Sequence, residues 1–248
     1  MPANSSANTI IDLNSRADSI NAVTQRMDQA LVKWRASCEP RREYLGCSYL
    51  GYECDRKVQY TYLHGLDADA QLLRIFDRGR WAEDYLADLI RRAGIALVTT
   101  QPGGGQFEVS FLDGRVCGHA DGIIAGSLDS DPLPFEVPTL WECKCLGDKG
   151  WKELVKAKLR RAKPHYFGQV QLYMAGLELN QCLFTALNGN TLELHHELVD
   201  FQPAVAEELL TRAARILMYT DAGELSARGF ERTDYRCRYC EHRTQCWR

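Results

Sequence analysis

The sequence predicts one α/β fold, in which a mixed β-sheet is flanked by helices and followed by a cysteine-bearing tail. Three observations lead to this prediction. Segments with apolar residues at helical spacing alternate along the chain with short, strand-like apolar runs. Two pairs of these runs are joined by turn residues, at Asp113-Gly114 and at Gly189-Asn190. Three cysteines lie close together near the C-terminus.

Each expected element follows from spacing and from turn or capping residues. Two helices are the clearest, because one has a narrow apolar stripe and the other ends at Gly94. The stripe consists of Ile20, Val23, Met27, Leu31 and Trp34, and the expected buried side of the second helix consists of Trp81, Tyr85, Leu86, Leu89 and Ile90. In chain order, we expect a helix over about 15–37, helical turns over 43–65, a helix over 76–94, a strand over 95–101, a hairpin over 105–126, a strand over 138–146, helices over 151–163 and 164–177, a hairpin over 181–200 and a helix over 203–223.

Composition bounds the class of protein. The 248 residues are 45% hydrophobic and carry a net charge of −3, so any nucleic-acid binding must come from a local basic patch. No apolar run is long enough for a membrane span, and the N-terminus lacks a secretion signal, so we expect a cytoplasmic protein. We expect a tail and amphipathic helix over 1–40 and a main domain over 41–248.

The run Trp141-Glu142-Cys143-Lys144-Cys145 places an acid and a base in an apolar strand. Side chains two positions apart share a face of a strand, so Glu142 and Lys144 are expected to project together, with the cysteines opposite. Asp121 lies near the end of the preceding apolar strand, where a carboxylate is costly to bury unless it is hydrated or bound to a cation. Two carboxylates and an ammonium around one point suit phosphodiester hydrolysis assisted by Mg²⁺ or Mn²⁺, and a surface ion pair is the structural alternative.

Two further features extend this site. Glu83 is expected on the inward side of a helix, where it could complete a metal site; a solvated glutamate of the first turn is the alternative. Gln169 and Tyr173 are four residues apart and share a helix face. An amide and a phenol in this arrangement suit a phosphate or base contact, or a structural hydrogen bond.

Four motifs follow one another along the chain: G-x-x-x-E at Gly79–Glu83, GHAD at Gly118–Asp121, ECK at Glu142–Lys144 and Q-x-x-x-Y at Gln169–Tyr173. In this order and spacing they resemble the RecB-like branch of the PD-(D/E)XK nuclease superfamily. The resemblance covers about residues 79–173 and implies a restriction-endonuclease-like fold. It assigns Glu83, Asp121 and Glu142 to metal binding, Lys144 to catalysis, and Gln169 and Tyr173 to DNA contact. Several members carry a histidine at the position of Glu83, so the choice of metal stays open.

The tail motif Cys237-x2-Cys240-x5-Cys246 supplies three thiols, and a tetrahedral sulfur site needs a fourth, from Cys54 or Cys47. From spacing alone, zinc competes with an iron–sulfur cluster. The pattern resembles the iron–sulfur subgroup of RecB-like nucleases, which includes AddB and the fourth CRISPR-associated protein family. That resemblance implies a structural [4Fe–4S] cluster held by Cys54, Cys237, Cys240 and Cys246, with zinc as the rival.

A basic segment follows the Glu-x-Lys strand. Between Lys149 and Lys163 the chain has seven basic residues and one acidic residue, a local charge of +6. We expect Lys149, Lys152, Lys156 and Arg160 to contact DNA phosphates, although a solvated helix face is the structural alternative.

The sequence therefore predicts a metal-dependent DNA exonuclease acting on single strands or duplex ends. The resemblance implies a context of phage recombination or CRISPR adaptation, with protein partners from those processes. The alternative functions are a structure-specific endonuclease and a non-catalytic DNA-end-binding subunit. The sequence leaves the oligomeric state open.

Overall fold

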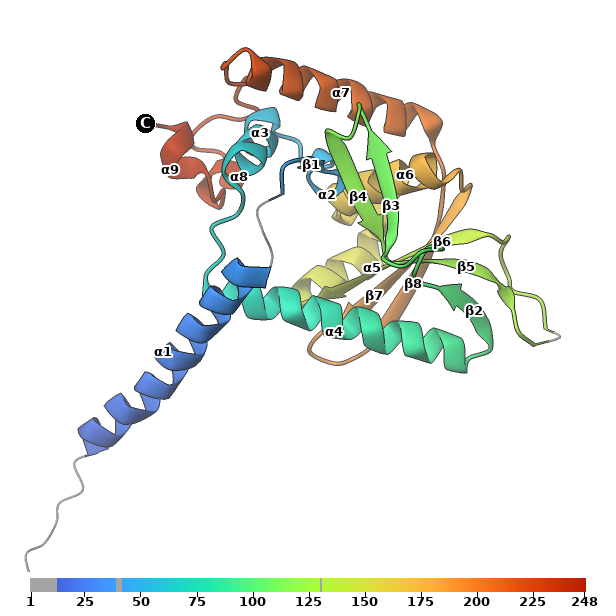
Figure 1. Ribbon diagram of the computed structural model, residues 1–248, viewed down its shortest axis with the longest axis horizontal. Coiled ribbons are helices and arrows are strands. Elements are labelled where there is room, and N and C mark those ends of the chain that lie inside the picture. Colours follow the sequence, from blue (N-terminus) through green and yellow to red (C-terminus); the bar gives the residue numbers. More distant parts are fainter. Residues whose placement is uncertain (1–12, 39–41, 130) are drawn as a thin grey trace, which may run out of the picture. The chain divides into compact units, whose positions relative to one another are not determined.

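The computed structural model describes residues 13–38, 42–129 and 131–248 (Figure 1). The chain falls into two compact units, Met1–Pro40 with Asp67–Phe76 and Arg41–Leu66 with Asp77–Arg248. The sequence-based division into residues 1–40 and 41–248 stays a prediction. In the structure, Asp67–Phe76 belongs to the same unit as the N-terminal segment. Among the described residues, no helix is long and apolar enough to cross a membrane.

The smaller unit consists mainly of helix. The first predicted helix is present as α1 (Leu13–Cys38), and α4 (Ala70–Arg92) contributes its first turns. Arg74 of α4 forms an ion pair with Asp28 of α1. The side chain of Ile20 lies outside the described set. Three members of the expected apolar stripe are exposed, namely Val23, Met27 and Trp34.

The larger unit contains two β-sheets, where the sequence predicted one. The first sheet has the strand order β1-β4-β3 and the second has the order β2-β5-β6-β7-β8. Both are mixed, because β1 runs parallel to β4 and β6 runs parallel to β7, while the other neighbours are antiparallel. The strands are β1 (Leu45–Gly46), β2 (Ile95–Val98), β3 (Phe107–Phe111), β4 (Val116–Ala120), β5 (Gly122–Ser127), β6 (Thr139–Leu146), β7 (Gln181–Asn188) and β8 (Leu194–Asp200).

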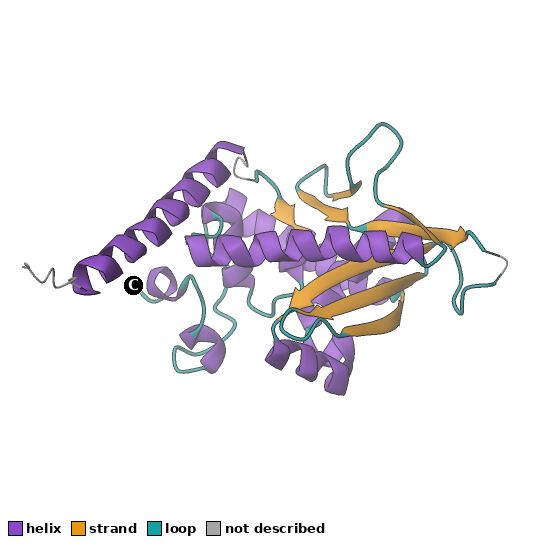
Figure 2. Ribbon diagram, turned by 90° about the horizontal axis from the view of Figure 1, so that it is seen from below, coloured by secondary structure: helices purple, strands orange, loops and turns teal. Residues whose placement is uncertain are grey.

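Helices flank these strands (Figure 2). α6 packs against strands of both sheets, and α7 packs against α6. The part of α4 from residue 77 onward packs on the five-stranded sheet through Ala82 and Leu86, which meet Trp141 and Cys143 of β6. The remaining helices are α2 (Cys47–Leu50), α3 (Asp55–His64), α5 (Asp148–Ala162), α6 (Pro164–Leu177), α7 (Pro203–Asp221), α8 (Tyr235–Arg238) and α9 (Arg243–Cys246).

The helix predicted over 76–94 is confirmed within α4, but part of its expected buried side is wrong. Gly94 follows the helix with a φ of +74°, which suits a glycine at the end of a helix. Leu86 is buried, whereas Trp81 and Tyr85 are 54% and 42% exposed. Their rings stack on each other at 5.4 Å, because residues four apart lie on the same helix face. Small Ala82 brings the helix close to the sheet and leaves these larger rings outside.

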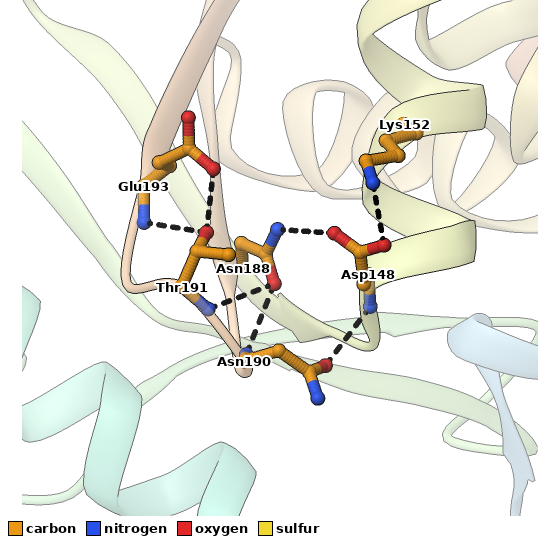
Figure 3. A network of polar contacts seen from close by, with 6 residues as sticks. All are labelled: Asp148, Lys152, Asn188, Asn190, Thr191 and Glu193. Atoms are coloured by element: carbon orange, nitrogen blue, oxygen red, sulfur yellow. Dashed lines mark hydrogen bonds and ion pairs between the residues drawn. The ribbon is translucent and has the colours of Figure 1, made fainter.

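The lysine-rich helix α5 is fixed at its start and bent near its end. Figure 3 shows Asp148 accepting hydrogen bonds from the side chain of Asn188, at 3.1 Å, and from Lys152, at 2.7 Å. Asn190 accepts a bond from the Asp148 backbone N–H at 3.0 Å. These contacts tie the beginning of α5 to the turn between β7 and β8. α5 therefore leaves the end of β6 in a fixed direction.

The bend in α5 lies at Lys158, whose φ is +67°. The next backbone N–H, of Leu159, donates to the carboxylate of Glu197 on β8 at 2.9 Å. A carboxylate at the first amides of a helical segment satisfies donors that have no partner within the helix. The predicted single helix is therefore two helical segments, with Glu197 capping the second.

Candidate active site

Asp121 lies where the chain passes from one sheet to the other. The apolar run over 116–126 looks like one strand in the sequence, but β4 ends at Ala120 and β5 begins at Gly122. The Asp121 carboxylate is 8% exposed and accepts a hydrogen bond from the backbone N–H of Cys143 at 2.8 Å. A side chain at Gly122 would have its Cβ 2.8 Å from the carbonyl oxygen of Val98, so the crossing needs a glycine. The crossing points Asp121 at β6.

Glu142 and Lys144 project together from β6, as expected. β6 is the central strand of its sheet, and its residues pair with β5 on one side and β7 on the other. Glu142 is fully buried, and its Oε1 forms an ion pair with the Lys144 ammonium, whose side chain is 22% exposed. Trp141 and Cys143 face the opposite side, toward α4. β5 pairs with β6 only as far as Trp141, so pairing with β7, at Phe184 and Ala186, holds the backbone of the acid and the base.

Glu83 reaches the same site from α4. Its Oε1 accepts a hydrogen bond from the side chain of Gln106 at 3.2 Å. Burial raises the pKa of Glu83 to about 7, and the nearby charge of Asp121 raises it further while Lys144 opposes the rise. The charges of Asp121 and Lys144 thus lie close enough to Glu83 to act on its pKa, and the three groups share one electrostatic environment.

The carboxylates crowd one another. Burial, followed by the charge of Asp121, raises the pKa of Glu142 to about 8, against the opposing effect of Lys144. Burial acts to lower the pKa of Lys144, but Glu142 and Asp121 hold it well above its usual value. Lys144 is consequently charged at neutral pH. Buried acids that repel each other in this way favour a cation between them.

The donor set fits a hard divalent cation. Three carboxylates supply oxygen ligands, which Mg²⁺ and Mn²⁺ prefer. Glu142 Oε2 is buried without a hydrogen-bond partner, and a buried lone carboxylate oxygen is costly unless something binds it. Within residues 13–38, 42–129 and 131–248, however, no group of three or more His, Cys, Asp or Glu side chains is arranged so that it could hold a metal ion. Glu142 Oε1 instead contacts Lys144 and Gln169.

Gln169 and Tyr173 lie behind Glu142. The Gln169 amide donates to Glu142 Oε1 at 2.9 Å and to the Tyr173 hydroxyl at 3.0 Å. The two side chains are only 5% and 3% exposed. DNA contact by this pair stays a prediction, while its burial favours the alternative role of a hydrogen-bonded pair that orients Glu142.

The basic face of α5 is solvent-exposed next to β6. Lys152 pairs with Asp148, and Arg160 donates to Gln202 and lies over the ring of Phe167. Lys149 and Lys156 are exposed and form no ion pair with another described residue. The proposed DNA contacts of the four cations stay predictions, and three of them, Lys149, Lys156 and Arg160, have no competing acidic partner in the described chain.

Four cysteines from the two ends of the larger unit line one small cavity, namely Cys54, Cys237, Cys240 and Cys246. Burial raises the pKa of the Cys237 thiol, and the nearby thiols of Cys54 and Cys246 raise it further. All ten cysteines are free. Cys47, the other candidate for fourth ligand, is fully buried in the core beside Gly118 and does not line this cavity.

The sequence did not reveal two contacts of the acidic site. Gln106 follows a run of three glycines, and nothing in that pattern links it to Glu83. Tyr166 places its ring 5.5 Å from the Lys144 ammonium, a cation–π contact that only the packing of α6 creates. The Pro164 start of α6 was the available signal for the position of Tyr166, because it fixes where the helix begins.

Comparison with solved structures gives the same architecture at low sequence identity. SSO0001 matches with a TM-score of 0.54 and 15% identity, over 91% of this chain and 96% of that chain. An alkaline exonuclease from Laribacter hongkongensis, LHK-Exo, matches with a TM-score of 0.51 and 18% identity, over 77% and 93%. LHK-Exo in complex with dAMP matches with a TM-score of 0.50 and 18% identity, over 73% and 89%. No family model and no curated protein matches the sequence. The chain therefore shares the mixed α/β fold of these proteins.

Proposed function

We propose that this protein is a divalent-metal-dependent DNA exonuclease that hydrolyses phosphodiester bonds from single-stranded or duplex ends. The observation that carries the proposal is the convergence of Glu83, Asp121, Glu142 and Lys144, with one oxygen of Glu142 buried and unpartnered. The fold supports it, since LHK-Exo, an alkaline exonuclease whose complex holds dAMP, has the same architecture.

Each side chain has a distinct task in this proposal. Asp121, Glu142 and Glu83 would hold a Mg²⁺ or Mn²⁺ ion, which would supply activation of water for attack and neutralisation of phosphate charge. Lys144, kept protonated by Glu142 and Asp121, stabilises negative charge that develops on the phosphate. Because it is charged, Lys144 acts as an electrostatic stabiliser or proton donor, and it does not act as the base. Gln169 positions Glu142 through its 2.9 Å hydrogen bond.

We further propose that Cys54, Cys237, Cys240 and Cys246 hold a [4Fe–4S] cluster, with zinc as the alternative occupant. The placement of all four thiols around one cavity supports this assignment, and so does the exclusion of Cys47 from it. A metal bound there would link α3, near the start of the larger unit, to the tail. We also propose a cytoplasmic location and a division into 1–40 and 41–248, both of which rest on the sequence pattern. A role beside recombination or CRISPR-adaptation proteins is a proposal that rests on the sequence resemblance.

The test compares end-labelled linear DNA with closed circular DNA in the presence of Mg²⁺ or Mn²⁺, using anaerobically purified protein. We expect linear DNA to be degraded to nucleotides or short products while circles stay intact. Cleavage of intact circles would show the endonuclease alternative. Binding to ends with no cleavage under either metal would show a non-catalytic end-binding protein and would refute the enzymatic proposal.

A further inference from the structure

A groove separate from the acidic site lies between the start of α6 and the cysteine-bearing tail. It has a volume of about 340 Å³. Aromatic rings form much of its lining, and Cys54, Cys237 and Cys240 separate it from the cysteine cavity. Its rings come from three parts of the chain: Tyr52, His165, and the tail residues Phe230, Tyr235 and Tyr239.

One part of the groove is built by a close backbone approach. A Cβ on Gly51 would stand 2.3 Å from the Cα of His165, so the glycine allows the segment before α3 to lie against the start of α6. The Tyr52 ring then stacks on the His165 ring at 4.9 Å with an angle of 4°. Burial and nearby lysines lower the pKa of His165 to about 4, so its imidazole is neutral at physiological pH. The two stacked rings in this part of the groove therefore carry no charge of their own.

The other part of the groove presents rings to solvent. Tyr235 and Tyr239 are 68% and 87% exposed, although large aromatic side chains are usually buried. No packing requirement within the described chain explains two exposed tyrosines on the same side of a groove. Exposed aromatic rings beside a groove are what unpaired bases stack on.

One edge of the groove lies near the acidic site. The rings of Tyr166 and His165 are 4.0 Å apart, and His165 stacks on Tyr52. Tyr166 in turn lies 5.5 Å from the Lys144 ammonium. Packed rings therefore connect the groove lining at His165 with the proposed catalytic lysine.

The charges of the groove are largely balanced. Lys57 lies over the Tyr52 ring at 4.0 Å and pairs with Glu241 at 3.2 Å. Arg236 pairs with Glu53 at 2.8 Å. Since acidic partners already neutralise both cations, stacking contributes more than phosphate attraction here, which distinguishes the groove from the basic face of α5. A duplex keeps its bases stacked inside, so only unpaired bases can use these rings.

We propose that this groove binds the single-stranded segment of the DNA substrate, with its bases stacked on Tyr235 and Tyr239. The inference rests on the proposed nuclease function and specifies its substrate: DNA that is single-stranded beside the reacting phosphate. Duplex DNA would have to be unpaired at its end before it could occupy the groove.

The first experiment measures binding of a single-stranded oligonucleotide containing 2-aminopurine, in EDTA so that no cleavage occurs. We expect the full-length protein to quench the base by stacking, and the double variant Tyr235→Ala/Tyr239→Ala to bind about tenfold or more weakly with little quenching. Tyr235→Phe/Tyr239→Phe keeps the rings and should keep binding. The control Trp81→Ala/Tyr85→Ala removes another exposed pair of rings, on α4, and should leave binding unchanged.

The second experiment separates stacking from phosphate attraction by the salt dependence of the same binding. The tyrosine-to-alanine variant should weaken affinity at every salt concentration without changing the slope, whereas Lys149→Ala/Lys156→Ala should make the slope shallower. Wild-type affinity in the tyrosine variant, or an equal loss in the Trp81/Tyr85 control, would overturn the proposal.

The two proposals fail in different ways. If wild-type protein degrades linear DNA while the tyrosine variant binds and degrades single strands normally, the groove assignment is wrong and the nuclease stands. If wild-type protein never cleaves DNA but its binding still depends on the tyrosines, the nuclease assignment is wrong and the groove stands.

Discussion

The carboxylate cluster and the cysteine cavity are both assembled from distant segments, but different forces hold them. Glu142 lies on a paired β-strand and is fully buried, and Asp121 lies between two paired strands, β4 and β5. The cavity cysteines lie at the start of α3 and on a tail with only short helical turns, α8 and α9 (Figure 1). The first site is fixed by the sheet, whereas the second depends on side-chain bonds between α3 and the tail.

Those side-chain bonds are numerous. Arg56 donates to the Ser226 carbonyl oxygen at 2.6 Å, and the buried Gln59 accepts from the Ser226 N–H at 2.7 Å. Thr61 and the buried His242 are hydrogen-bonded at 2.9 Å. These polar contacts, with the ring contact between Tyr60 and His242, hold the tail against α3. The difference implies that catalysis and tail attachment can be disrupted separately.

The largest effect is expected for Lys144→Ala. Loss of the ammonium beside Glu142 should lower kcat by about 10²–10⁴-fold, because charge on the reacting phosphate is no longer stabilised. Single-turnover cleavage of end-labelled DNA measures the rate, and anisotropy should show DNA binding largely retained. Arg92→Ala, which removes a surface ion pair with Asp88 on α4, is the control and should cleave normally. Wild-type rates for Lys144→Ala would refute its catalytic assignment.

The converse test disrupts the cysteine cavity. Cys240→Ser should yield colourless protein with little bound iron and a lower Tm, because a cluster ligand is lost. Cys117→Ser is the matched control, since Cys117 lies outside the cavity and donates to the Gly114 carbonyl oxygen, a bond serine can make. Metal analysis and visible absorbance decide the outcome. Zinc in place of iron in wild-type protein would establish the rival metal, and full colour in Cys240→Ser would remove this residue from the ligand set.

A smaller effect is expected for Gln169→Ala. Without its hydrogen bond, Glu142 is less well oriented, so the apparent affinity for Mn²⁺ should fall about 10–100-fold. Gln171→Ala is the matched control on the same helix, because Gln171 bonds only the Asp200 carbonyl oxygen and the Gln202 N–H among the described residues. It should lower Tm and leave metal affinity unchanged. Equal metal affinity in Gln169→Ala and wild type would show that Gln169 has no positioning role.

The smallest effect concerns pH. The pKa values of Glu83 and Glu142 are raised to about 7 and about 8 in the folded protein, above their usual value of 4.5. A raised acid pKa stabilises the fold at low pH, and this contribution is lost as pH rises through the folded pKa. In EDTA, Tm should therefore fall from about pH 4.5, the usual pKa of these acids, up to about pH 8, and added Mg²⁺ should restore more stability at the upper pH. Glu83→Gln should flatten this profile; an unchanged profile would contradict the coupling of these acids.

The sequence predicted much of the acidic site for a simple reason. Glu142 and Lys144 are two residues apart on one strand, and this spacing alone puts them on the same face. Gln169 and Tyr173 likewise share a face because they are four apart on a helix. Local periodicity therefore determined which side chains point together within one element. It also separated the basic segment of α5 from the acidic remainder of the chain.

Tertiary structure decided how the elements meet. Only the crossing at Asp121, from one sheet to the other, aims that carboxylate at β6, and an uninterrupted apolar run in the sequence hides the crossing. The burial of Gln169, the exposure of Trp81 and the line of rings from Tyr166 to Tyr52 also depend on which helix packs on which neighbour. Periodicity fixes the face of an element, but the partner of that face is set by contacts between residues far apart in the chain.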